Sequence, residues 1–402
     1  MTAAGGTAFP PRERRCAGKR KQEMKFFMDT GKTVSSPAEE NTGRPVSAAL
    51  RETGEFCCSN HLVNILAERM VRAQKELFSA PASPDRETLL LLSDAASFNL
   101  DLREFFLKRL AEGRTDEGCA GIVMLDQLYR KYGETEAVRQ FLPAAAARLD
   151  SAGAEAADRF AEDPAPESLV GPAMLAGMNL LCARLALALG ETRIANERNA
   201  LYRKRKEAFL KEFYTEKGRF RESSQTGAVL ALRFGLTPDD RDLWALVVDS
   251  LLKDIEKKRA MHFSTGLLGT AYLLPVLTDA EALDTAWQLF LQSSRPSWLY
   301  PVIRQGAPPC VAWSAVSQWL FETVCGIRPD FGARRFMIAP RFGRFLRYAR
   351  ARYDSVYGPV TSEWRREDED FILDFTVPRG TGALVRGKLY GPGKFTLKIR
   401  HY

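Results

Sequence analysis

Two periods of apolar and polar positions divide the chain into two parts. From about Phe56 to Cys325, apolar residues recur every three or four positions between short breaks, which is the spacing of amphipathic helices. The pattern predicts eleven helices, over 59–80, 84–112, 119–134, 136–150, 167–190, 193–214, 226–234, 239–258, 264–276, 279–292 and 311–325. Because the connections are short, we expect neighbouring helices to pack antiparallel in pairs.

Several predicted boundaries carry start and stop residues of known mechanism. "LALALGET" should end a helix at Gly190, which has no Cβ and can adopt the left-handed conformation that follows many helices. "LTPDDRDLW" should begin a helix with Thr237 as N-cap and Pro238 as the first helical residue. In "LTDAEALDTAW", Thr278 or Asp279 should cap the next helix. These signals indicate helical hairpins.

After "GIRPDFG" the period changes to two. The stretches "RFMIAP", "LRYARARYDSVYGPVTSEWRRE", "DFILDFTVP" and "GALVRGKLYGPGKFTLKI" alternate apolar and polar residues between Gly and Pro turns, as half-exposed strands do. We therefore expect a small antiparallel β domain at 328–402 after a helical domain at 55–327. Turn formers and charges dominate 1–54, which should be a poorly ordered leader.

Composition and charge add that the chain is globular. Its 402 residues are 45% hydrophobic, enough for a sizeable core. No run of 18 apolar residues and no apolar signal region stand out, so we expect no membrane partner and a cytoplasmic location. Residues 1–28 hold seven Lys and Arg against two Glu, which accounts for +5 of the net charge of +8. Because the charge concentrates there and no binding motif follows, no nucleic-acid partner is predicted.

Cysteine and histidine are arranged unlike a metal site. The seven cysteines form no C-x-x-C pair and only three histidines are present. A zinc site or a Cys-His nucleophile has little support from this arrangement. We expect reduced, buried thiols and no cofactor.

One short stretch, "SPDRETLLLLSD" at 83–94, carries two carboxylates around a leucine run. Glu87 and Asp94 are seven residues apart, so on one helix they would lie on one face, about 10 Å apart from the rise per residue. They could be catalytic groups. They could equally be solvated charges on either side of a buried leucine stripe.

The order of several motifs resembles one enzyme family. "FCCSNHLVNIL", "SPDRETLLLLSDAASFNLDLREFF", "FSTGLLGTAYLLPVL", "PSWLYPVIRQGA", "CVAWSAVSQWLFETVCGIRPDFG" and "YDSVYGPVTSEWRREDEDFILDFTVPRGTGALV" follow one another as in the bacterial α-L-rhamnosidases of glycoside hydrolase family 78. The resemblance implies a mainly α fold, an (α/α)6 six-hairpin toroid followed by a small antiparallel β-sandwich. It also implies a carbohydrate partner containing rhamnose.

In that family the stretch similar to 82–94 carries the general acid and sugar-binding acids. Its register places Glu87 as the general acid, with Arg86 and Asp94 as substrate-binding residues. Three departures weaken the match: Ala82 stands where an aspartate is expected, Ser83 where a cysteine is expected, and Leu91 where a tryptophan would bind the sugar. An inverting glycosidase holds its acid protonated, which an apolar wall such as the leucine run could favour.

The family's general base has no evident counterpart. "QGAPPCVAWSAVSQW" lacks the W-E pair that would carry the base, and no acidic residue lies between Asp284 and Glu322. The resemblance further implies Asp158 near the sugar, next to Arg159 in place of a tryptophan.

Two tryptophans complete the predicted pocket. Trp298 is expected near the sugar, although loop packing explains it equally well; Trp313 is a second candidate, although packing in the core of the last helix explains it better. Two hypotheses follow: an inverting α-L-rhamnosidase, or a catalytically silent relative that binds carbohydrate or is only structural.

Overall fold

The computed structural model describes residues 50–80, 86–112, 118–151, 158–159, 161–304 and 314–400, without the side chains of 86–88, 91 and 151. The helices are α2 His61–Ser79, α3 Arg86–Asn99, α4 Arg103–Ala111, α5 Cys119–Tyr132, α6 Thr135–Ser151, α7 Glu167–Ala188, α8 Thr192–Phe213, α9 Gln225–Arg233, α10 Arg241–Lys253, α11 Leu267–Asp279, α12 Leu283–Phe290, α13 Tyr300–Ile303 and α14 Val316–Trp319. Two π-helical turns, Asp254–Lys258 and Leu320–Val324, extend α10 and α14.

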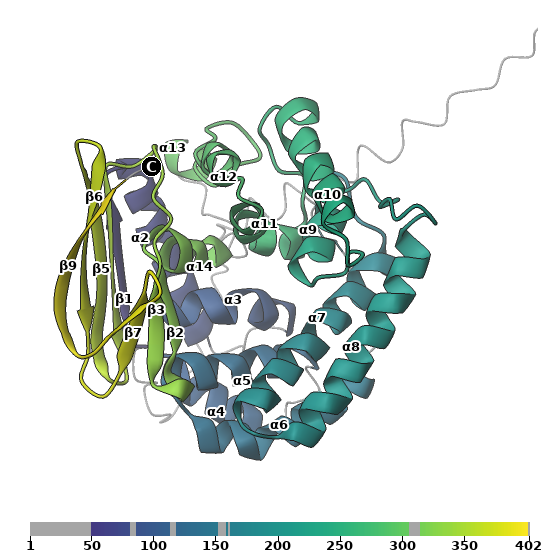
Figure 1. Ribbon diagram of the computed structural model, residues 1–402, viewed down its shortest axis with the longest axis horizontal. Coiled ribbons are helices and arrows are strands. Elements are labelled where there is room, and N and C mark those ends of the chain that lie inside the picture. Colours follow the sequence, from purple (N-terminus) through teal and green to yellow (C-terminus); the bar gives the residue numbers. More distant parts are fainter. Residues whose placement is uncertain are drawn as a thin grey trace, which may run out of the picture.

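Six of these helices form a closed inner ring. Along α3, α5, α7, α9, α11 and α14 each helix contacts the next, and α14 contacts α3 again. Figure 1 shows α2, α4, α6, α8, α10 and α12 outside this ring. The chain alternates between outer and inner helices, so the six inner helices run in one direction, as in a six-hairpin toroid. The predicted fold class is confirmed, and the described residues are mostly helical (56%).

Two inner helices, α7 and α11, are apolar nearly all round. α7 would pass as a membrane span by length and hydropathy, but 78% of its most apolar window is buried inside the protein. This burial is expected for an inner helix, which packs on both ring neighbours and on outer helices. Among the described residues it is the only helix long and apolar enough to cross a membrane.

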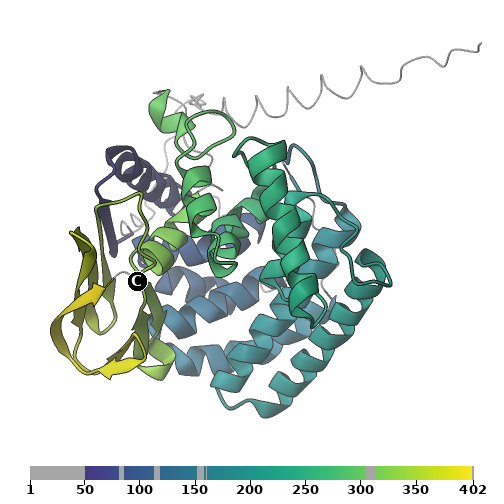
Figure 2. The same ribbon diagram turned by 45° about the horizontal axis from the view of Figure 1, so that its top comes forward.

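The strands form two sheets beside the ring. They are β1 Gly54–Cys58, β2 Ile327–Asp330, β3 Arg335–Ile338, β4 Tyr348–Ser355, β5 Gly358–Glu367, β6 Asp370–Val377, β7 Gly382–Val385, β8 Lys388–Tyr390 and β9 Gly393–Arg400. A five-stranded antiparallel sheet has the order β1-β4-β5-β6-β9, and a four-stranded sheet has the order β2-β3-β7-β8. Figure 2 shows both sheets together on one side of the helices.

Two features of the sheets differ from the prediction. β3 and β7 pair in parallel, so the smaller sheet is mixed rather than antiparallel. β1 precedes all the described helices in the chain, yet it pairs with β4 in the larger sheet, Gly54 opposite Tyr353. The segment before the helices therefore completes the sheet that follows them.

Four predicted helix boundaries are wrong. The predicted helix 84–112 breaks after Asn99, because Leu100 bridges Glu52 and the Asp101 N–H bonds Arg51 O. α10 begins at Arg241 with Asp240 as N-cap, not at Thr237 and Pro238.

α11 runs through Thr278 and Asp279 instead of stopping before them. The residue before α12 is Ala282, which makes no side-chain cap. Gly190, by contrast, has φ of +80° as predicted.

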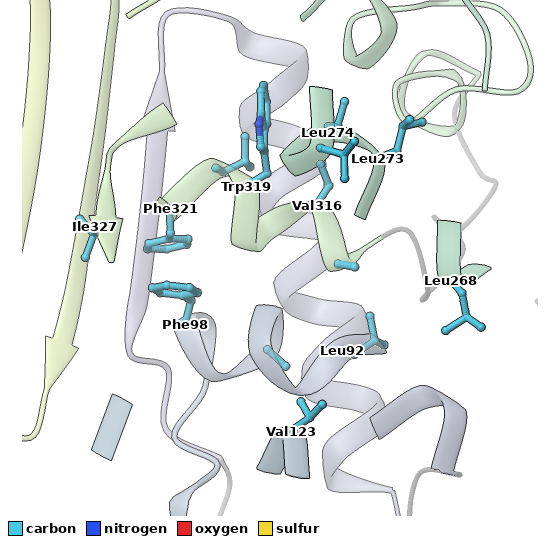
Figure 3. Packing of buried hydrophobic residues seen from close by; sticks show 14 of the residues in the cluster. Leu92, Phe98, Val123, Leu268, Leu273, Leu274, Val316, Trp319, Phe321 and Ile327 are labelled. Carbon is cyan, nitrogen blue, oxygen red and sulfur yellow. The ribbon is translucent and has the colours of Figure 1, made fainter. Parts of the chain in front are cut away.

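The core joins the ring to the sheets. In Figure 3, Phe98 from α3 lies face to face with Phe321 from the π-turn after α14, with ring centroids 4.9 Å apart, and Ile327 of β2 lies beside them. From the larger sheet, the Trp364 Nε1–H donates to Val324 O at 2.8 Å and the Ser362 hydroxyl donates to Cys325 O at 2.6 Å. Ring and sheets thus share one continuous core.

Candidate functional site

Two of the residues that resemble a glycosidase site, Glu87 and Asp158, lie at or before the start of an inner helix. Glu87 lies in the first turn of α3, and Asp158 lies between α6 and α7. The segment 305–313, which holds Trp313 and the stretch where the base is expected, precedes α14 and lies outside the described residues, as do the side chains of Arg86 and Glu87. Because the inner helices run in one direction, their starts meet at one face, which we call the N-terminal end of the ring.

Asp158 is a buried carboxylate at this N-terminal end. It is 7% exposed, and its Oδ2 accepts the N–H of Ala165, just before α7, at 2.9 Å. Gly266, just before α11, allows its close approach, because a Cβ there would lie 2.1 Å from Asp158 Oδ1. Burial raises the pKa of Asp158, although the Ala165 N–H opposes this. Asp158 therefore connects the starts of α7 and α11.

Trp298 lies in packed surroundings before α13. It is 1% exposed, and its ring lies against Phe263 and Phe290, with centroids 4.7 and 5.9 Å away. The Nε1–H has no hydrogen-bond partner among the described residues. Its contacts are those of a core side chain, and its role in sugar binding stays a prediction.

Asp94 lies elsewhere, in a cluster of charges shared by three inner elements. Its carboxylate lies 2.9 Å from Lys131 Nζ and 3.0 Å from Arg130 Nη2, both on α5. The Gln318 Nε2–H of α14 donates to Asp94 Oδ2 at 2.8 Å and to Glu322 Oε2 at 3.0 Å. Arg130 also pairs with Asp126 at 2.7 Å and with Glu322 at 3.5 Å. We call Asp94, Asp126, Arg130, Lys131, Gln318 and Glu322 the charged cluster.

The charged cluster faces a cavity of about 440 Å³ to which all six inner helices contribute. Arg233 is the last residue of α9, Ala188 the last of α7, and Arg130 lies in the last turn of α5; all three line the cavity. Other lining residues lie earlier in their helices, such as Leu90 on α3 and Ala271 and Tyr272 on α11, so the cavity extends along the inside of the ring to its C-terminal end.

Burial and neighbouring charges perturb the cluster strongly. Burial alone would raise the pKa of Asp94, but the charges of Lys131 and Arg130 outweigh it and lower the pKa to about 2. Burial lowers the pKa of Lys131 to about 8. Burial raises the pKa of Glu322, and the charge of Asp94 raises it further. Burial also raises the pKa of Asp126.

Sequence reasoning missed most of this cluster. The signal was present in "CAGIVMLDQLYRKY", where Asp126, Arg130 and Lys131 interrupt an otherwise apolar helix. Asp126 and Arg130, like Gln318 and Glu322, are four residues apart and so share a helix face. Charges on an inner helix must be paired, because burying an isolated charge is costly.

The two ends of the ring offer different chemistry. The N-terminal end holds the start of α3 with Glu87 and the buried Asp158, which suit proton transfer or hydroxyl binding. The C-terminal end holds a charge network around a cavity, which suits binding of a small polar ligand. Among the described residues no group of three or more His, Cys, Asp and Glu could hold a metal ion.

Two family models match the chain. The bacterial α-L-rhamnosidase six-hairpin glycosidase domain matches residues 111–316, and the bacterial α-L-rhamnosidase C-terminal domain matches residues 326–387. The chain is 31% identical to an α-L-rhamnosidase of Streptomyces avermitilis over 310 residues, covering 69% of this chain and 30% of the relative. It is 30% identical to an α-L-rhamnosidase of Formosa agariphila over 244 residues, 54% of this chain and 26% of the relative. The chain thus spans less than a third of these relatives.

Solved structures share the fold. The Streptomyces avermitilis α-L-rhamnosidase complexed with L-rhamnose superposes with a TM-score of 0.77 at 24% identity, covering 88% of this chain and 42% of that one. The α-L-rhamnosidase of Aspergillus terreus superposes with a TM-score of 0.79 at 22% identity, covering 87% and 50%. At these identities the likeness concerns the fold of ring and sheets together.

Proposed function

Because the chain belongs to the bacterial α-L-rhamnosidase six-hairpin glycosidase family, we propose that it hydrolyses terminal α-L-rhamnosides with inversion, with Glu87 as the general acid. The observation that carries the proposal is the closed ring, which brings the start of α3 to the same end as the buried Asp158. The rhamnose-bound relative supports rhamnose as the sugar recognised there.

The acid role requires Glu87 to hold a proton near neutral pH. The first turn of a helix favours an ionised carboxylate, so the surroundings of Glu87 must oppose that effect. The leucine run contributes little of this, since Leu89 and Leu92 are fully buried in the core and Leu90 lines the cavity of the C-terminal end. A bound sugar that excludes water from Glu87 would supply the missing desolvation.

The second carboxylate is the weaker half of the proposal. Asp158 is 7% exposed and its Oδ2 already accepts the Ala165 N–H, so we assign it to positioning sugar hydroxyls rather than to activating water. No acid stands between Asp284 and Glu322, where the family's base is expected. This gap favours the alternative function, a relative that binds rhamnosides without cleaving them.

The test compares wild type with Glu87→Gln on 4-nitrophenyl α-L-rhamnoside. Glu104→Gln is the matched control, because Glu104 is an exposed glutamate in the first turn of the outer helix α4. We expect turnover that falls at least a hundredfold in the Glu87 variant and is unchanged in the control. NMR of the first product should show β-L-rhamnose, the inverted anomer.

Other results separate the two functions. Turnover that survives Glu87→Gln would remove the acid assignment. No turnover on any aryl glycoside, together with calorimetric binding of L-rhamnose, would establish the silent binding function instead.

A further inference from the structure

We propose that the cavity at the C-terminal end of the ring is a second ligand site, which takes a small sugar acid, that is, a hydroxylated ring bearing one carboxylate. The site reaches the C-terminal end of the ring, whereas Glu87 lies in the first turn of α3. The proposal does not require that the protein cleaves rhamnosides.

The floor of the cavity is charged yet accessible. The side chains of Asp94, Asp126, Arg130 and Glu322 are 20, 12, 25 and 19% exposed. They are neither sealed in the core nor spread over an open surface, and desolvating charges to this degree is costly. Groups with perturbed pKa values that converge on a cleft are characteristic of binding and catalytic sites.

The positive charge of two arginines that line the cavity indicates that the ligand is an anion. Arg184 on α7 and Arg233 on α9 line the cavity, are exposed, and pair with no carboxylate among the described residues. Arg233 lies over the ring of Tyr272, 5.4 Å from its centroid. Guanidinium groups bind carboxylates with two parallel hydrogen bonds. Each of these two arginines thus offers donors for a ligand carboxylate inside the cavity.

The remaining lining suits hydroxyl groups. Carboxylate oxygens of Asp126 and Glu322 can accept hydrogen bonds from hydroxyls, and the guanidinium of Arg130 can donate to them. Leu90, Val123 and other apolar residues on the same wall can face the C–H side of a sugar ring. A volume of about 440 Å³ is in the usual range for small-ligand pockets.

The two arginines could also have a purely structural role, which the experiment must distinguish from ligand binding. Arg233 ends α9, and Arg184 lies in the last two turns of α7, so both also offset the negative charge of helix C-termini. If that were their only role, replacing them would change stability and leave ligand binding unaffected.

Calorimetry on the full chain tests the site with D-glucuronate as the probe. D-glucose lacks the carboxylate, acetate lacks the ring, and inorganic phosphate is an anion of different shape. We expect D-glucuronate to bind at least tenfold more tightly than each of these three. Arg233→Gln and Arg184→Gln should each weaken binding about tenfold or more, the usual effect of losing one charged hydrogen-bonding partner. Arg203→Gln, on the exposed face of α8, should change nothing.

The possible outcomes decide the proposal. Both cavity variants carry exposed substitutions, so thermal unfolding should match the Arg203→Gln control and show that they are folded. Absence of glucuronate binding, equal binding of phosphate, or binding unchanged in both cavity variants would overturn it. Binding lost in Glu87→Gln but retained in the cavity variants would place the ligand at the N-terminal end and also overturn it.

Discussion

The charged cluster makes Asp94→Asn the most informative stability test. Asparagine keeps the shape of the side chain but removes its charge. Lys131, which is 0% exposed, then loses its carboxylate at 2.9 Å. Arg130 still pairs with Asp126 and Glu322, so Lys131 is the group left uncompensated.

Removing one partner of a buried ion pair typically costs about 3–5 kcal/mol. Lys131 keeps the Ser97 hydroxyl at 2.9 Å, the Asp94 backbone carbonyl, and the Phe98 ring at 3.4 Å. These contacts place the expected loss near the lower limit, about 3 kcal/mol.

The pH dependence isolates the contribution of Asp94 itself. Its pKa falls from 3.8 in the unfolded chain to about 2 in the folded protein, which corresponds to about 2 kcal/mol. A lowered carboxyl pKa stabilises the fold above pH 3.8, and this stabilisation is lost as the pH falls from 3.8 to 2. The difference between wild type and Asp94→Asn should therefore shrink by about 2 kcal/mol between pH 5 and pH 2.

Lys131 has the opposite pH window. Its folded pKa of about 8 lies below the ordinary 10.5, so the folded protein binds fewer protons than the unfolded chain between these values. Stability should therefore rise with pH from 8 to 10.5.

Urea unfolding followed by tryptophan fluorescence measures these differences. Asp239→Asn is the matched control, since Asp239 also pairs with a lysine, Lys206, at 2.6 Å but is 92% exposed. It should cost under about 1 kcal/mol. Asp94→Asn combined with Lys131→Met should recover part of the loss, because no orphan charge remains. If Asp94→Asn costs no more than Asp239→Asn, the cluster does not hold the ring together and the reasoning fails.

Two further substitutions test local packing by urea unfolding. Gly177→Ala would place a Cβ 2.2–2.6 Å from the ring of Phe234 and should lower the free energy of unfolding by about 1–3 kcal/mol. The control Gly391→Ala meets nothing within 4 Å and should be close to neutral. Equal effects would contradict the tight contact between Gly177 and Phe234. Asp240→Ala removes the N-cap side chain of α10, which accepts two backbone N–H groups at 2.9 Å, and should lower the free energy of unfolding by about 1 kcal/mol. The neighbouring substitution Asp239→Ala should cost less. The reverse order would contradict the role of Asp240 as the cap.

Local sequence patterns predicted the helices and strands well, because buried and exposed positions recur with a fixed period along each of them. In β4 every second residue is buried, as the alternation in "YARARYDS" predicts. The inner helices were detectable because their apolar residues face neighbours on several sides. Helix starts were harder to predict, since Thr237-Pro238 and Asp240 are all plausible start signals within four residues.

Long-range pairing was beyond the sequence. β1 has only five residues, and its partner strand lies almost 300 positions later, so no local period marks it. The break after Asn99 has the same cause, because Leu100 leaves the helix to bridge Glu52. Both features depend on where the segment around residues 51–58 docks.

The candidate site was only half accessible to motif reasoning. The spacing within the motif predicted that Asp94 belongs to the same site as Glu87, seven residues earlier. On α3 that step corresponds to about 10 Å of rise, and the donors that hold Asp94 lie on the later turns of α5 and on α14. Although its spacing from Glu87 matches the family motif, Asp94 therefore lies further along α3 and lines the cavity.

This division of the ring explains how the family fold can persist while catalytic motifs change. Apart from Leu91 within α3, the departures from the family pattern precede α3, α7 and α14 in the chain. The charged cluster lies further along the same helices and joins α3, α5 and α14 by contacts that involve none of those segments. Stability and catalysis should therefore separate by mutation: Glu87→Gln should remove turnover without lowering the urea midpoint, whereas Asp94→Asn should lower the midpoint. A large loss of stability in Glu87→Gln would show that the two ends are energetically coupled.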